Sequence, residues 1–258
     1  MKTTRSPIVL MLSALLCTAQ SPSPAPLRHL EYHYSVLYQQ SGESRVSGIG
    51  TAGSGVESND GSAARQGTLA FDVLQAANDG GLVVRATETI EHTDRSMTSL
   101  CAVYGNGSVA CRTEDRPSDA MEAVLQHLGR DFLDASVIDA TGHWTRTFDG
   151  GGFKVTSTFS MTEMPDNVHA KVYEHRTIRK STQVAPGTAT LYDRADRSYQ
   201  DLFANSDEDY TILYDTTMEV PDTIHDEAVD QAGIQGHVRT YIDLNLQKDS
   251  FSKPSGGR

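Results

Sequence analysis

The stretch HLEYHYSVLYQQ, residues 29–40, decides the fold class of this 258-residue chain. Apolar and aromatic residues occupy every second position, separated by mainly polar ones: Leu30, Tyr32, Tyr34, Val36 and Tyr38. Successive side chains of a β-strand point to opposite faces, so a repeat of two residues is typical of a strand with one buried face. The pattern therefore predicts a long strand with the tyrosines on its apolar side.

The same repeat returns in three other parts of the chain. They contain Leu69, Phe71 and Val73; Phe153, Val155, Phe159 and Met161; and Val238, Ile242, Leu244 and Leu246. Further strands are predicted at 82–91, 168–178, 187–193 and 210–218, and turns rich in Asn, Asp and Gly at 59–61, 78–81 and 149–152. Strands are thus expected in both halves of the chain, and the two halves can share one sheet.

One amphipathic helix is predicted near residues 119–129. Its apolar residues recur at intervals typical of a helix: Met121, Val124, Leu125, Leu128 and Phe132. Asp119 and Glu122 have the spacing of a capping box, and Gly129 offers a place to stop. One such helix among alternating strands predicts a mainly β fold: a curved antiparallel sheet or half-barrel, β-clam-like, with the helix packed against its concave face.

Both ends of the chain are predicted to lie outside this domain. Residues 1–19 have the layout of a secretory signal peptide, with basic residues, an apolar run at 8–16 and small residues before the cleavage site. Residues 20–27 are a Pro- and Ser-rich tether, 28–251 form a single domain and 252–258 are a flexible tail. The apolar run is about half of the ~20 residues that a membrane-spanning helix needs, so no transmembrane segment is expected.

These features predict export to the periplasm or the extracellular space. Lipoprotein anchoring at Cys17 is the alternative, but the bulky Leu16 directly before it fits that processing poorly. Removal of Lys2 and Arg5 with the signal peptide leaves 20 basic and 34 acidic residues, a net charge of −14. This acidic balance argues against nucleic acid or an anionic membrane as the main partner.

Two cysteines remain in the mature chain, both in LCAVYGNGSVACR, residues 100–112. A three-residue hairpin loop at 105–107 would pair Cys101 with Cys111 at a non-hydrogen-bonded position. The Cα atoms of such a pair lie about 4.5 Å apart, within the range of a disulfide. A Cys101–Cys111 disulfide is therefore predicted, in keeping with an oxidising compartment, and two free thiols are the alternative.

Several short motifs suggest chemistry but lack the surroundings that it needs. The glycines at 48–53 match the spacing of a dinucleotide-binding turn, yet no helix pattern follows to hold a phosphate. His29 and His33 share a strand face but are too far apart for one metal ion, and Glu174-His175 does not complete a zinc-enzyme motif. Residues 205–209 are expected to form a solvated acidic loop, with calcium binding as the alternative. No catalytic residue, metal site or cofactor is therefore predicted.

The tyrosines of the first strand are the strongest indication of a ligand. Buried strands usually carry aliphatic side chains, and three hydroxyl groups need hydrogen-bond partners or a wet cavity. Core packing is the alternative to a ligand-lined cavity. The predicted ligand-binding residues are Tyr32, Tyr34, Tyr38, Phe71, Phe153 and Phe159.

A signal peptide followed by long antiparallel strands with one helix among them resembles the periplasmic lipoprotein carriers and related β-clam lipid-binding proteins. The resemblance is one of architecture and depends on no specific residue. It implies an exported, non-enzymatic protein that binds a hydrophobic or amphipathic small molecule such as a lipid. The alternatives are an interaction or structural module of the cell envelope or surface, and a metal-assisted secreted hydrolase.

Overall fold

The structure is a computed structural model. It describes residues 25–46, 55–58, 60–76, 81–104, 108–112, 117–128, 132–133, 136–150, 153–180, 203–232 and 236–251. The predictions for the signal peptide and most of the tether, for the glycines at 48–53, for a strand at 187–193 and for the tail fall outside these residues, and the domain limits stay a prediction.

The described strands form one sheet in which every neighbouring pair is antiparallel. Its order is β6-β5-β4-β3-β1-β12-β11-β10-β9-β8-β7, and the short β2 pairs with the end of β1. The strands are β1 (Arg28–Val46), β2 (Gly55–Ser58), β3 (Gly61–Ala76), β4 (Leu82–Ile90), β5 (Ser96–Val103), β6 (Val109–Cys111), β7 (His143–Gly150), β8 (Phe153–Glu163), β9 (His169–Lys180), β10 (Phe203–Asp215), β11 (Val220–Ala232) and β12 (Gly236–Asp249). The predicted mainly β, antiparallel fold is confirmed.

Strand β1 joins the two halves of the chain. It pairs with β3 on one side and with the last strand, β12, on the other. The strands before helix α1 (Asp119–Leu125) therefore form one arm of the sheet, from β3 to β6, and those after it form the other, from β12 to β7. Both halves share one sheet because the first and the last strand are neighbours.

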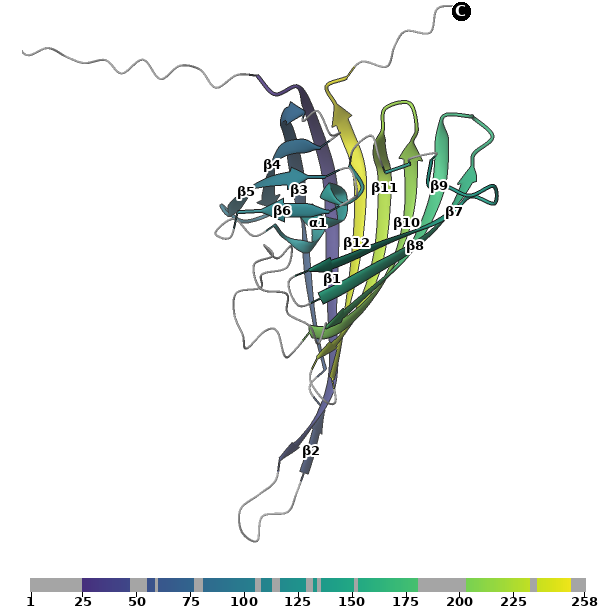
Figure 1. Ribbon diagram of the computed structural model, residues 1–258. Helices are drawn as coiled ribbons and strands as arrows, with labels where there is room; N and C mark the ends of the chain where they lie inside the picture. Colours follow the sequence, from purple (N-terminus) through teal and green to yellow (C-terminus); the bar gives the residue numbers. More distant parts are fainter. Residues whose placement is uncertain are drawn as a thin grey trace, which may run out of the picture.

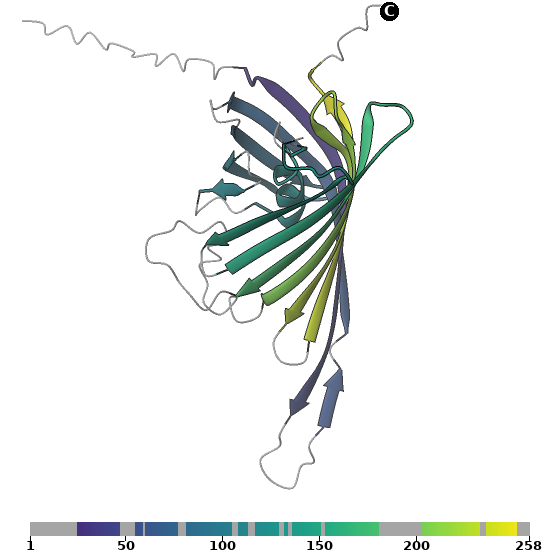
Figure 2. The ribbon, with the colours of Figure 1, turned by 45° about the vertical axis from the view of Figure 1, so that its right-hand side comes forward.

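The sheet is strongly curved, and α1 lies on its concave side. In Figures 1 and 2 the two arms bend toward each other with α1 between them. Hydrogen bonds hold the helix there from both ends: Tyr38 of β1 donates to Asp119 (3.3 Å), and His127, just after the helix, bonds Glu174 of β9 (2.6 Å). The predicted position of the helix is confirmed.

Helix α1 has seven residues and is shorter than the predicted range. Ser118 precedes it as the N-cap, and its side-chain oxygen accepts a hydrogen bond from the backbone N–H of Met121 (3.3 Å). The predicted capping box is therefore wrong, because this serine, and not the aspartate after it, is the N-cap. Leu128 and Phe132 continue the apolar pattern but reach the core from the segment after the helix. No helix in the described parts of the chain is long and apolar enough to cross a membrane.

The concave face of the sheet carries the core. On β1, Tyr32 and Tyr34 are 0% exposed, whereas Leu37, on the opposite face, is 37% exposed. Helix α1 covers this face with buried Met121 and Leu125. Full burial of one such apolar side chain contributes about 1.5–3 kcal/mol. The alternation in residues 29–40 thus determines which face of the sheet the helix covers.

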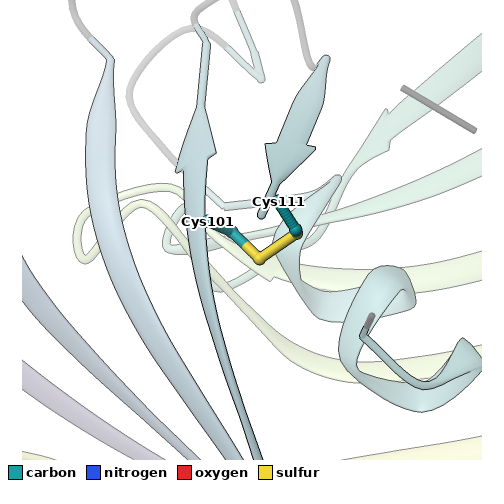
Figure 3. Close-up of a disulfide and its surroundings, with 2 residues drawn as sticks. All are labelled: Cys101 and Cys111. Atoms are coloured by element: carbon teal, nitrogen blue, oxygen red, sulfur yellow. A yellow bond between two sulfur atoms is a disulfide. The ribbon is translucent and has the colours of Figure 1, made fainter. Parts of the chain in front are cut away.

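The predicted disulfide is confirmed. Figure 3 shows Cys101 of β5 bonded to Cys111 of β6, with an S–S distance of 2.03 Å and Cα atoms 4.1 Å apart. The hairpin has the predicted register, since residues 102 and 110, and 103 and 109, lie opposite each other. The N–H of Tyr104 donates to the carbonyl of Ser108 (2.8 Å), at the pair that closes the loop. The bridge is consistent with an oxidising, extracytoplasmic location.

The sequence patterns do not predict β7 and β11, and they misplace the acidic stretch at 205–209. That stretch lies inside β10, so its prediction as a loop is wrong. The physical reason is that the concave face is polar at this level, where Glu208 of β10 lies beside Arg176 of β9 in the sheet. Asp226 likewise interrupts the apolar repeat of β11 between two buried apolar residues, which hides the strand from a search for alternation.

Candidate functional site

The predicted tyrosines lie on the concave face of β1, and protein groups accept hydrogen bonds from all three hydroxyls. Tyr38 is partly buried, and the other two are fully buried. In chain order, Tyr32, Tyr34 and Tyr38 donate to the carbonyl of Pro221 (2.8 Å), the carboxylate of Glu88 and the carboxylate of Asp119 (3.3 Å). Each of the three tyrosine hydroxyls therefore has a hydrogen-bond acceptor within the protein.

The predicted phenylalanines separate into two places. Phe71 of β3 makes an edge-to-face contact with Tyr32, with ring centroids 5.8 Å apart. Phe159 of β8 belongs to the other arm, where it stacks on Trp144 at 4.7 Å and meets Phe132 at 6.0 Å. The side chain of Phe153 lies outside the described part of the structure. The five predicted residues whose side chains are described are therefore not brought together at one point.

The concave face also carries a set of buried and half-buried polar residues that the sequence does not single out. We call it the polar cluster; its members are Gln126, His127, Glu174, Arg176, Glu208, Tyr210 and Asp226. They come from the end of α1 and from β9, β10 and β11. In the sheet Glu174 faces Tyr210, which faces Asp226, so the cluster crosses three neighbouring strands.

Arg176 is the centre of the polar cluster. Its guanidinium contacts Glu174 at 2.8 Å and Glu208 at 3.4 Å, and it donates to the side-chain oxygen of Gln126. It also lies over the ring of Tyr210, 5.0 Å from the centroid. The side chain of Arg176 is 7% exposed, and a buried charge requires such partners.

His127 connects the helix to the sheet. Its Nδ1 lies 2.5 Å from the carbonyl oxygen of Ala123, and its Nε2 lies 2.6 Å from Glu174. Burial would raise the pKa of Glu174, but the charge of Arg176 and the hydrogen bond from His127 outweigh burial and hold this pKa at about 2. Glu174 is therefore ionised at neutral pH, between a cation and a ring N–H donor.

Asp226 has the opposite character. Burial, followed by the negative charge of nearby Glu208, raises its pKa to about 9. Its Oδ1 atom has no hydrogen-bond partner among the described residues. A protonated carboxyl group is the form that such surroundings favour, so the cluster holds a neutral acid, Asp226, as well as the ionised Glu174.

A signal for the polar cluster is present in the sequence of β9. There the alternating positions read Ala170, Val172, Glu174, Arg176 and Ile178, so two charged residues interrupt an otherwise apolar face. Opposite charges two positions apart on one strand face indicate an inward ion pair. The alternation along β9, and not the neighbouring Glu174-His175 pair, is therefore the sequence signal for the polar cluster.

A second, half-buried ion pair lies on the other arm. Arg65 of β3 contacts Glu88 of β4 at 3.2 Å, and Glu88 is 1% exposed. The Arg65 guanidinium lies 5.8 Å from the ring centroid of Tyr34 and 5.9 Å from that of Tyr38. Charged groups thus lie on the concave face of both arms, and on this arm they border Tyr34 and Tyr38.

A different surface follows from the register of β7, β8 and β9. Phe148, Val155 and Ile178 lie opposite one another and are partly exposed. Two residues further along each strand lies a polar row of Arg146, Ser157 and Arg176. Residues two apart on a strand point to the same face, so the apolar row and the polar row adjoin. We call these six residues the two-row surface.

The histidines considered from the sequence have ordinary partners. His29 lies between Asp72 (2.6 Å) and Glu31 (2.8 Å), and His33 lies 3.5 Å from Glu91. The hydrogen bonds that His29 makes to Asp72 and Glu31 raise the pKa of His29. These contacts are polar pairs on the convex face of β1.

No protein-family model and no curated protein sequence matches the chain. Among solved structures, one described as "Lipid-protein interactions in lipovitellin" is similar, with a TM-score of 0.48 and 9% identity; the match covers 90% of this chain and 26% of that chain. A mutant porin of Rh. blastica has a TM-score of 0.21 and 9% identity, over 85% of this chain and 100% of that chain. The chain thus spans about a quarter of the lipovitellin chain.

Proposed function

We propose that the protein is an exported, non-enzymatic carrier of an amphipathic molecule that has a hydrocarbon chain and an anionic head group. The observation that carries the proposal is the two-row surface, where a partly exposed apolar row adjoins a row with two arginines. A ligand of this kind needs one apolar and one cationic surface side by side, and the sheet register provides both on one face.

The apolar row would hold the hydrocarbon chain. Neighbouring strands are about 4.8 Å apart, so three opposed side chains make a strip about 10 Å long. Each methylene removed from water contributes about 0.8 kcal/mol. Five methylenes covered by Phe148, Val155 and Ile178 would then contribute about 4 kcal/mol.

Arg146 would hold the head group. Its guanidinium lies 5.7 Å from the ring centroid of Phe132 and 5.6 Å from that of Phe159, and it donates to the carbonyl of Phe132 (3.0 Å). These contacts orient a planar group that has five N–H donors and matches a carboxylate or phosphate. Arg176, the other arginine of the polar row, is engaged by Glu174 and Glu208.

The test is binding of a fluorescent fatty acid to the mature, oxidised protein, together with mass spectrometry of lipids that copurify with it. Ile178→Asp places a charge in the apolar row and is expected to weaken binding at least tenfold. Tyr173→Asp is the matched control, because this residue is on the same strand but on the convex face and is 43% exposed. Binding to the control variant should equal that of the wild type.

Arg146→Gln tests the head-group part separately. Hydrogen bonds to charged groups contribute about 1.5–3 kcal/mol, so dodecanoate should bind more than tenfold more weakly to the variant, while dodecanol should bind equally to both proteins. Absence of bound lipid and of fatty-acid binding by the wild type would refute the proposal. Equal affinity of the Ile178→Asp and Tyr173→Asp variants for the fatty acid would show that the ligand binds elsewhere.

A further inference from the structure

Three neighbouring strands bring His169, Asp215 and Asp222 together at one end of the sheet. His169 at the start of β9 lies opposite Asp215 at the end of β10, and Asp222 follows at the start of β11. One potential ligand atom from each residue lies within 4.8 Å of the other two. Nε2 of His169 lies 3.0 Å from Oδ2 of Asp222.

The orientation of the imidazole is determined by a fourth residue. Nδ1 of His169 bonds the carboxylate of Asp166. Asp166 is itself held by the backbone N–H groups of Val168 (3.0 Å) and His169 (2.9 Å). When Nδ1–H donates to a carboxylate, Nε2 is available as an electron-pair donor, which is the arrangement around metal-bound histidines.

Asp215 is also positioned before any ion binds. Its Oδ1 accepts hydrogen bonds from the backbone N–H groups of Thr217 (2.8 Å) and Met218 (2.9 Å), and the residue is 2% exposed. A buried carboxylate close to the second carboxylate of Asp222 is unfavourable, because like charges repel and burial strengthens the repulsion. One divalent cation would offset both charges.

We propose that His169, Asp215 and Asp222 bind a divalent cation of the zinc type, with Asp166 as the residue that positions the imidazole. One imidazole nitrogen and two carboxylate oxygens are ligands that Zn²⁺ uses, with water in the fourth position. Tetrahedral ligands about 2.0–2.1 Å from zinc lie about 3.3 Å from one another, so small side-chain movements would suffice. The site has no residue in common with the two-row surface and is independent of the proposed carrier function.

The experiment is a calorimetric titration of the EDTA-treated, untagged mature protein with Zn²⁺. One zinc ion per chain is expected, together with a higher melting temperature. His169→Gln and Asp222→Asn should each weaken zinc binding at least tenfold. Asp166→Asn keeps all three ligands and should weaken it by about 10–100-fold, as removal of such an orienting carboxylate does.

His225→Gln is the matched control. His225 also bonds a carboxylate, Asp243 at 2.7 Å, but belongs to no such cluster among the described residues. Zinc binding by this variant should equal that of the wild type. The proposal is overturned if the wild type binds no zinc, or if His169→Gln and Asp222→Asn, shown to be folded by circular dichroism, bind it as tightly as His225→Gln.

Discussion

Replacement of Asp226 by Asn should stabilise the protein, and the gain should grow as the pH rises. In the folded protein Asp226 is buried and its pKa is about 9, whereas its ordinary value is 3.8. Folding therefore takes up a proton between these two pH values. The contribution of this group to stability is fully present below pH ~3.8 and is lost as the pH rises through ~9.

The magnitude follows from proton linkage. Between the two pKa values, each pH unit lowers the free energy of unfolding by at most about 1.4 kcal/mol through this one group. Three units, from pH 5 to pH 8, set an upper limit of about 4 kcal/mol. Part of the pKa shift comes from the charge of Glu208, so the shift belongs partly to the pair. We therefore expect the stability gain of Asp226→Asn over the wild type to increase by about 2–4 kcal/mol from pH 5 to pH 8. Asn has nearly the shape of the protonated acid, so the variant keeps the packing and does not titrate.

The assay is urea unfolding of both proteins at pH 5, 6.5 and 8, followed by tryptophan fluorescence. Trp144 is the single tryptophan of the chain and is 5% exposed, so its emission reports loss of the core. Glu163→Gln, at an exposed carboxylate of β8, is the control and should show no gain that increases with pH. A difference between Asp226→Asn and wild type that is constant, or that shrinks from pH 5 to pH 8, would refute the reasoning.

Three further substitutions test the packing of the concave face and its edge. Arg176→Met should destabilise the protein by about 3–5 kcal/mol in urea unfolding, because it leaves two carboxylates without their shared cation. The double variant Cys101→Ala, Cys111→Ala should keep its β circular dichroism but lose about 2–3 kcal/mol, measured as a lower melting temperature, and the oxidised wild type should show no free thiol from this pair on unfolding. Gly67→Ala should cost at least about 1–3 kcal/mol, since its Cβ would lie 2.1 Å from a backbone oxygen of the next strand, whereas Gly61→Ala, with nothing within 4 Å, should be nearly neutral.

The sequence by itself determined the features that depend on neighbours along the chain. The alternation from Leu30 to Tyr38 identified a strand and its buried face, because side-chain direction in a strand depends only on odd and even position. The Cys101–Cys111 pair followed from the length of one loop, because a hairpin register is local. The existence of the helix followed from its spacing, although its start and length did not.

Only the tertiary structure decided which side chains meet across the concave face. His127 and Glu174 are 47 positions apart, and their contact requires that the helix fold back onto β9. Glu174 is ionised and Asp226 is protonated because their burial and the charges around them differ, and the type of residue does not determine either state. His169 and Asp222 likewise approach each other only when β9 and β11 flank β10, so local spacing in the sequence carries no sign of that site.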